Sequence, residues 1–298
     1  MIQKLKFVGA IVIACLITAC GSPEPAGPVT PFKIGAIADC QYADKDTTGN
    51  RIFRSSPEKL TEAVGVMNEF DLSFVVHLGD FIEEDWESYG TLNEITAGLD
   101  HPLRHVVGNH EYHVADDKKA DVHKVLGMPG RYYSFEHGDW VFAVVDGNDL
   151  SYHGWPKSSE RYRESTALHR SQYPDEFTWN GAMGEEQIQW LDNLMARADR
   201  DGKRVVVFSH FPVFPDHDLN LWNADDVSAV FESHPSATAW INGHNHDGAY
   251  AERNGIHYIT LNAMLDTERN AFSILEFHDD KLLLSGFGRQ RDMELTLR

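Results

Sequence analysis

Aspartate, glutamine, asparagine and histidine side chains recur in five short clusters, each at the end of an apolar run. The clusters are Asp39-Cys40-Gln41, Gly79-Asp80, Gly108-Asn109-His110-Glu111, Ser209-His210 and Gly243-His244-Asn245-His246. Carboxylate, amide and imidazole groups are ligands for divalent metal ions, and these clusters supply enough of them to hold two ions side by side. Two such ions can hold a hydroxide that attacks phosphorus in line. The clusters therefore predict a phosphoester hydrolase that needs no side-chain nucleophile.

The apolar runs before the clusters are predicted to be strands that position these ligands. They cover residues 34–37, 74–78, 103–107, 205–208 and 239–241. Ligands of open α/β sheets collect at the carboxyl ends of the strands. Helical spacing is found at residues 57–70, 184–199 and 223–233, and further strands are expected at 131–135, 140–145, 256–261, 271–277 and 281–287. The order of these elements predicts two packed sheets with helices outside.

The spacing inside the clusters suggests how individual ligands act. Asp39 and Gln41 are two residues apart at a strand end, so extended backbone would place both on one face and Cys40 in the core. His244 and His246 have the same spacing. The carboxylate of Asp80 can bridge two ions, while Asn109 offers a neutral oxygen and His210 an imidazole.

These motifs, in this order, resemble the calcineurin-like metallophosphoesterase superfamily, whose pattern is D-x-H, G-D, G-N-H-[DE], H and G-H-x-H. The resemblance covers residues 34–287 and implies a four-layer α/β/β/α sandwich of two mixed β-sheets flanked by helices. It implies a first metal held by Asp39, Gln41, Asp80 and His246, and a second held by Asp80, Asn109, His210 and His244. His110 would be the catalytic residue that faces the phosphoryl group and the leaving oxygen.

Gln41 departs from this pattern, because most members have histidine there. An amide oxygen favours Mn²⁺ or Mg²⁺ over zinc or iron, so we expect two divalent ions, with Mn²⁺ preferred and Mg²⁺, Fe or Zn as alternatives. Residues 37–44, 221–223 and 243–248 resemble the manganese-dependent ADP-ribose/CDP-alcohol diphosphatase branch. That resemblance implies hydrolysis of the P–O–P bond of nucleoside diphosphate derivatives.

Other functions remain open at this point. A broad-specificity phosphomonoesterase, phosphodiesterase or protein phosphatase could use the same scaffold. A purple acid phosphatase is disfavoured, because Glu83 stands where that family has tyrosine. A lipoprotein that binds a ligand without catalysis is disfavoured by the complete ligand set together with His110.

Three residues are candidates for substrate contacts. Trp222 could stack on a nucleobase or simply pack in the core, and Asn223 could bind substrate or cap a helix. Tyr42 lies beside the first motif and could face the diphosphate. The long segment 148–180 matches neither helix nor strand patterns, and it is either a solvated insertion or a loop that covers the substrate.

The N-terminal residues predict export. Lys4 and Lys6 precede a short apolar run, which is followed by Ala19-Cys20-Gly21 and a proline-rich stretch. This pattern resembles a bacterial lipoprotein signal, with a signal peptide at residues 1–19, a lipidated Cys20 and tether at 20–31, and the hydrolase domain at 32–298. The expected location is the periplasmic face of the outer membrane of a Gram-negative bacterium. Cys40 alone would remain in the domain, so no disulfide is expected there.

The formal net charge of −20 argues against nucleic acid or anionic lipid as a partner. The expected partner is a small nucleotide, with membrane contact only through the lipid. Two dications would reverse the negative charge locally.

Overall fold

The computed structural model describes residues 30–298, so the predicted signal peptide, Cys20 and most of the tether lie outside the described residues. In the described part, none of the helices has the length and apolar character needed to span a bilayer. The helices are α1 Ser56–Met67, α2 Ser88–Thr96, α3 Val122–Val125, α4 Glu160–Gln172, α5 Glu185–Asp201 and α6 Ala224–Glu232. The strands are β1 Phe32–Ile37, β2 Phe74–His77, β3 Leu103–His105, β4 Tyr133–His137, β5 Trp140–Val144, β6 Leu150–Ser151, β7 Gly181–Ala182, β8 Arg204–Phe208, β9 Ala237–Asn242, β10 Ala249–Arg253, β11 Ile256–Thr260, β12 Ala271–Phe277, β13 Lys281–Gly288 and β14 Met293–Thr296.

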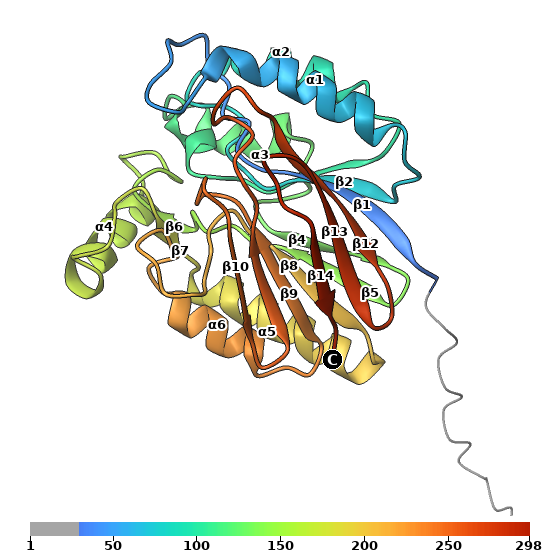
Figure 1. Cartoon of the computed structure of the whole chain (residues 1–298). Helices are drawn as coiled ribbons and strands as arrows, with labels where there is room; N and C mark the ends of the chain where they lie inside the picture. The colour runs from blue at the N-terminus through green and yellow to red at the C-terminus, as the bar shows by residue number, and fades with distance from the viewer. Residues whose placement is uncertain (1–29) are drawn as a thin grey trace, which may run out of the picture.

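Two six-stranded mixed sheets form the centre of the molecule. The first has the order β14-β13-β12-β1-β2-β3, and the second has the order β10-β11-β9-β8-β5-β4. In the first, β1 pairs with β2 in parallel and with β12 antiparallel; in the second, β8 lies parallel to both β5 and β9. The helices α1 and α2 lie outside the first sheet, and α5 and α6 lie outside the second (Figure 1). The predicted four-layer α/β/β/α sandwich is confirmed.

Alternation along β5 shows how the second sheet separates two cores. Phe142 and its neighbours of the same parity face the first sheet, where the edge of one ring meets the face of the other between Phe142 and Phe74 of β2, with centroids 5.0 Å apart. Val141 and Ala143 belong instead to the cluster beneath α5 and α6. Because β5 is buried on both faces, it reads as a continuous apolar run, as parallel strands do.

The insertion at residues 148–180 is folded, in contrast to the structureless segment that its sequence suggested. Strand β6 pairs with β7, and between them Ser159 caps the start of α4, because its hydroxyl accepts the Tyr162 N–H. Arg131 fixes the insertion to the body of the protein, because its guanidinium bonds buried Asp146 and lies over the Trp155 ring. The insertion protrudes as a separate lobe beside the ends of the sheets (Figure 1).

Candidate metal centre

The backbone at the strand ends adopts an unusual conformation at four of the predicted ligands. Asp39, Gln41, Asp80 and His244 have positive φ angles of 53°, 47°, 53° and 66°. Side chains with a Cβ rarely occupy this left-handed region, and such strain collects at functional sites. The expectation that Asp39 and Gln41 share a face because of strand alternation was therefore wrong: β1 ends at Ile37, and left-handed residues aim both side chains. Cys40 is fully buried in the core, as predicted.

Short backbone contacts hold these loops against each other. The Gln41 N–H donates to the Asp80 carbonyl at 2.7 Å. The buried carboxylate of Glu111 accepts the N–H groups of Asp80 at 2.9 Å, of Gly108 at 2.7 Å, and of Phe81. The glutamate of the Gly108–Glu111 motif thus joins the loops after β2 and β3, and it positions Asp80 through its backbone.

Two motif glycines leave room for the carboxylates. A Cβ on Gly243 would lie 2.6 Å from Asp39 Oδ2, and one on Gly108 would overlap Asp80 Oδ1. Any larger residue would displace a predicted ligand. The glycines before Asn109 and His244 are therefore explained by the close approach of an acidic side chain.

The side chains predicted to hold the second metal converge on one point. The Nε2 atom of His210 lies 3.3 Å from Asp80 Oδ2, 3.2 Å from Asn109 Oδ1 and 3.1 Å from His244 Nδ1. All four atoms carry lone pairs, and these residues are buried. Lone pairs that converge away from water repel one another unless a proton or cation lies between them. This donor set fits a divalent cation.

The side chains predicted for the first metal lie next to this point. Asp39 Oδ1 is 3.9 Å from His246 Nε2, and the Asp39 carboxylate accepts the His244 N–H at 3.2 Å. The amide oxygen of Gln41 is buried and has no hydrogen-bond partner among the described residues. A buried oxygen without a partner is costly, and a hard cation would satisfy it. The residues of this half also fit a metal ion.

Each histidine of the centre has a second partner that fixes its orientation. His210 Nδ1 lies 2.9 Å from the Leu78 carbonyl, and His246 Nδ1 lies 3.0 Å from Asp266 Oδ1. His244 Nε2 lies 3.0 Å from the amide oxygen of Asn180. Since an acceptor requires the proton on the nitrogen that faces it, the opposite nitrogen of each ring is left free toward the centre.

The pKa values show how strongly these groups interact. Burial raises the pKa of Asp39 to about 6. Burial opposes ionisation of Asp80 too, but His210 and His110 hold the pKa of Asp80 well below its usual range. For His210, burial lowers the pKa, yet Asp80 prevails and raises it to about 9. A bound cation would take the place of such a proton, so metal binding is expected to release protons.

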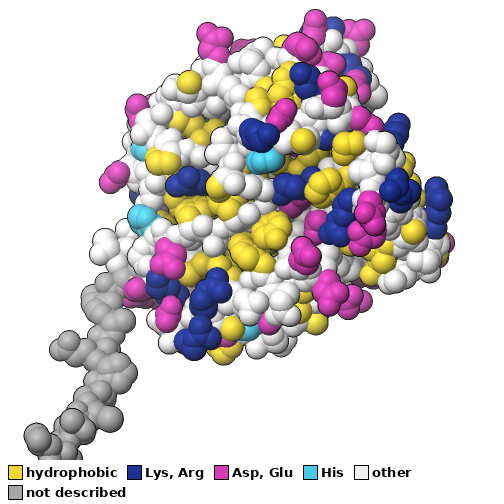
Figure 2. Space-filling model, turned by 180° about the vertical axis from the view of Figure 1, so that it is seen from behind, with side chains coloured by type: hydrophobic (Ala, Val, Ile, Leu, Met, Phe, Trp, Pro, Cys, Tyr) yellow, Lys and Arg dark blue, Asp and Glu magenta, His cyan; other side chains and the backbone are white. Residues whose placement is uncertain are grey.

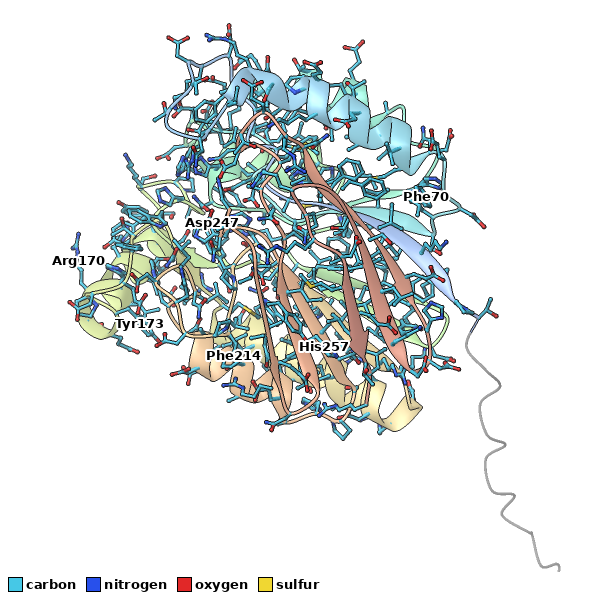
Figure 3. All side chains as sticks on the ribbon, in the orientation of Figure 1. Phe70, Arg170, Tyr173, Phe214, Asp247 and His257 are labelled. Carbon is cyan, nitrogen blue, oxygen red and sulfur yellow. The ribbon has the colours of Figure 1, made fainter. Side chains whose placement is uncertain are left out.

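His110 stands at the edge of the centre. Its backbone N–H donates to Asp80 Oδ1 at 2.9 Å, and its Nδ1 lies 2.9 Å from the Glu83 carbonyl. Its ring lines a cavity of about 650 Å³ between the strand ends and the insertion. Asp247, which also lines this cavity, is labelled in Figure 3 and marks its place in the molecule. The cavity is lined by Thr48, Asn50, Arg51, Asp80, Asn109, His110, His113, Trp179, Leu219, His244, Asn245, His246, Asp247 and Asp266.

Comparison of the chain with known proteins identifies its family. The model of the calcineurin-like phosphoesterase family matches residues 32–248. The chain belongs to the calcineurin-like phosphoesterase family. It is thus a metal-dependent phosphate hydrolase that uses a divalent metal cofactor, and the described residues contain a site of the kind that this family requires.

Several relatives match almost the whole chain. Proteins named manganese-dependent ADP-ribose/CDP-alcohol diphosphatase from Danio rerio and Arabidopsis thaliana are 30% and 28% identical, with 89% and 88% of this chain covered and 98% and 96% of theirs. A solved dimetal phosphatase from Danio rerio superimposes with a TM-score of 0.80 at 28% identity, covering 91% of this chain and 100% of that chain.

The three predicted substrate contacts do not line the metal-centre cavity. The Asn223 amide bonds the backbone of Met183 at both ends, so the residue stands at the start of α6 without capping it through its side chain. The Trp222 indole donates to the Phe177 carbonyl and packs in a buried aromatic cluster. Tyr42 packs against the main core. These side chains have structural partners, as the packing alternative for Trp222 allowed, and a contact with substrate stays a prediction for all three; Trp222 and Asn223 line a separate cavity.

The sequence patterns missed four residues that the fold brings to the centre. Asn180 and Asp266 orient histidines, Glu83 contacts Gln41 and His110, and Trp179 lines the cavity. None belongs to a cluster after an apolar run. The one usable signal was the aromatic content of segment 148–180, which ends in Trp179 and Asn180.

Proposed function

We propose that this enzyme hydrolyses the P–O–P bond of nucleoside diphosphate derivatives such as ADP-ribose and CDP-alcohols, with two divalent ions, Mn²⁺ above all. The observation that carries the proposal is a pair of adjoining cavities. The cavity of the metal centre and a second cavity of about 620 Å³ are both lined by His113, next to His110. A diphosphate with two substituents has two ends to place on either side of the cleaved bond. A phosphomonoester with a small alcohol has one.

The first cavity has features that suit a nucleotide. Trp179 is 43% exposed on the cavity wall, and its ring stacks on Phe177 with centroids 4.2 Å apart. A flat, supported aromatic surface can stack on a nucleobase. Arg51 lines the same cavity and can bind a phosphate oxygen. Basic, acidic and apolar side chains are interspersed on the face shown in Figure 2, so no single acidic patch covers that face.

The protein's own part in the reaction is to position and to stabilise charge. When bound, the ions would neutralise phosphoryl oxygens and lower the pKa of water. Asp39, Gln41, Asp80 and His246 would hold one ion, and Asp80, Asn109, His210 and His244 the other. His110, held at Nδ1 by the Glu83 carbonyl, is placed to stabilise or protonate the leaving oxygen at the cavity edge.

Gln41 and the relatives support manganese and this substrate class. The amide oxygen that has no protein partner adds to the oxygen donors of Asp39, Asp80 and Asn109, which favours an oxygen-preferring ion. The Danio rerio relative named for ADP-ribose and CDP-alcohol hydrolysis extends over nearly the full chain.

The proposal is tested by product analysis. Metal-free protein loaded with Mn²⁺ is expected to convert ADP-ribose into two monophosphates and CDP-choline likewise, detected by ³¹P NMR. Release of inorganic phosphate from monoesters, with ADP-ribose and CDP-choline untouched, would favour the phosphomonoesterase alternative and overturn the proposal.

We further propose that the enzyme is exported and lipid-anchored through Cys20 at the outer membrane. The support is the pattern of residues 1–31 in the sequence. In a Gram-negative host, labelling with a palmitate analogue is expected to mark the wild type and to be lost in Cys20→Ala. Equal labelling of both proteins would contradict the anchor.

A further inference from the structure

Glu83 lies in the loop after β2, where it contacts two groups of the metal centre at once. Its side chain is 8% exposed, and its backbone N–H donates to the Tyr42 carbonyl at 3.0 Å. That bond fixes Glu83 beside the loop that carries Gln41. Its carboxylate then meets the Gln41 amide and the His110 ring.

The contact with Gln41 decides which end of the amide faces the metals. Glu83 Oε2 lies 2.7 Å from Gln41 Nε2. An ionised carboxylate can only accept hydrogen bonds, so the amide atom next to it must be the nitrogen. The amide oxygen is thereby turned to the opposite side, where it is buried and has no partner among the described residues.

Two further contacts keep this arrangement in place. Lys45 Nζ lies 3.0 Å from the other carboxylate oxygen of Glu83. This cation lies beside a carboxylate whose side chain is only 8% exposed, and it holds the carboxylate in place as an acceptor. The same Oε2 lies 3.1 Å from His110 Nδ1, and the Nε2 atom of that ring lies 2.9 Å from Gln41 Nε2, so the ring contacts the same end of the amide.

We propose that Glu83 is a positioning residue that locks the Gln41 amide with its oxygen toward the metal centre, which makes glutamine a competent ligand in place of the family's histidine. Without the carboxylate, the His110 ring alone holds the NH₂ group, so the amide is freer to rotate by half a turn and present that group, which cannot bind a cation. The inference rests on the proposed assignment of Gln41 as a metal ligand, but not on the identity of the substrate.

The test is a titration of metal-free protein with Mn²⁺ alone, in which the EPR signal of free Mn²⁺ measures binding. Glu83→Gln removes the charge and supplies its own NH₂ group, so Mn²⁺ affinity at one site is expected to fall about 10- to 100-fold, the usual effect of losing an outer-shell partner. Glu84→Gln is the matched control: Glu84 also pairs with Lys45, but its side chain is 48% exposed, and wild-type affinity is expected.

A double-mutant cycle shows whether Glu83 acts through Gln41. In a Gln41→Ala background, Glu83→Gln is expected to cause no further loss of Mn²⁺ affinity. A further loss of the same size would overturn the proposal, because Glu83 would then act through His110 or the loop. Wild-type affinity in Glu83→Gln alone would overturn it as well.

A second variant distinguishes a loss of Mn²⁺ affinity from a loss of folded protein. Glu83→Asp keeps the charge but withdraws the carboxylate from the amide, so a smaller loss of Mn²⁺ affinity is expected, again only when Gln41 is present. Metal-free thermal unfolding should be similar for all variants. Tight Mn²⁺ binding without cleavage of ADP-ribose would overturn the proposed function and leave this inference standing.

Discussion

The two sheets contribute different kinds of ligand, and the molecule holds them in different ways. The first sheet supplies oxygen donors, of which Asp39, Gln41 and Asp80 are aimed by left-handed backbone. The second supplies His210, His244 and His246, each with a hydrogen-bond partner behind its ring, although His244 also has a positive φ.

The difference shows where each half of the site is vulnerable. The oxygen side depends on loop geometry, on glycines without a Cβ and on the buried Glu111 that joins two loops. The histidine side depends on single hydrogen-bond acceptors from distant segments, such as the Leu78 carbonyl behind His210 and Asn180 of the insertion behind His244. A change on the oxygen side should disturb geometry, whereas a change behind a histidine should weaken binding by degrees.

Asp80 belongs to both predicted sets of metal ligands, so its loss should impair binding of both ions. Asp80→Asn keeps the shape but removes the charge that both ions would share, and kcat is expected to fall about 1,000-fold, the scale of losing one strong electrostatic group. Steady-state kinetics with saturating Mn²⁺ would measure this. More than a tenth of wild-type activity would rule out the bridging role.

Asn180 tests the histidine side alone. Asn180→Ala removes the acceptor behind His244 and should lower Mn²⁺ affinity about 10- to 100-fold, with kcat largely recovered at high Mn²⁺. Asn68→Ala is the control, because the Asn68 amide donates to the Gly98 carbonyl as the Asn180 amide donates to the Asp218 carbonyl, but Asn68 lies at the surface and contacts no histidine of the centre. If the two variants bind Mn²⁺ equally well, Asn180 has no role in holding His244.

Gln41→His replaces one oxygen donor of the first sheet with a nitrogen donor. The ratio of Zn²⁺ affinity to Mn²⁺ affinity should rise on the order of tenfold, because imidazole suits zinc better than an amide oxygen does. Competition titrations of metal-free protein would measure the ratio. An unchanged ratio would mean that Gln41 does not contact the ion.

His234 extends the comparison to a histidine outside the centre whose ring nitrogens both face carboxylates, Asp199 at 2.6 Å and Asp192 at 3.1 Å. Burial lowers the pKa of His234, but the two aspartates prevail and raise it. The folded state therefore holds the proton more tightly, so this stabilisation is complete below about pH 6.5 and is lost as pH rises through the higher folded pKa.

The expected effect is small, because the pair lies near the surface. The difference in unfolding free energy between wild type and His234→Gln should be below about 1 kcal/mol at pH 6 and should vanish at high pH. Denaturant unfolding at several pH values measures it. A difference that grows with pH would have the wrong sign for a protonated His234.

The sequence predicted the sheets well, because the buried strands are short apolar runs, and five of them are followed by a polar cluster. β1, β2, β3, β8 and β9 lie where the runs before the clusters predicted them, and β5 lies where a further strand was expected. β10 and β14 were missed because they are short, exposed on one face and mixed in polarity. The helix α4 was missed because its sequence is polar throughout and has no apolar stripe.

For the site, as for the fold, some expectations were right and others were wrong. The predicted ligands are brought together, but the reason offered for Asp39 and Gln41 was wrong, since left-handed backbone cannot be read from alternation. Asn180, Asp266 and Glu83 reach the centre through contacts between segments far apart in sequence, which no local pattern reveals. Trp222 and Asn223 matched a motif but serve packing and backbone contacts.

An anomalous difference map at the manganese edge, from a crystal of the Mn²⁺-loaded protein, tests the central claim most directly. We expect two peaks that share Asp80, one in contact with the Gln41 amide oxygen and the other with His244 Nδ1. A single peak, or two peaks with the Gln41 nitrogen facing the ion, would contradict the division of the centre into an oxygen side and a histidine side.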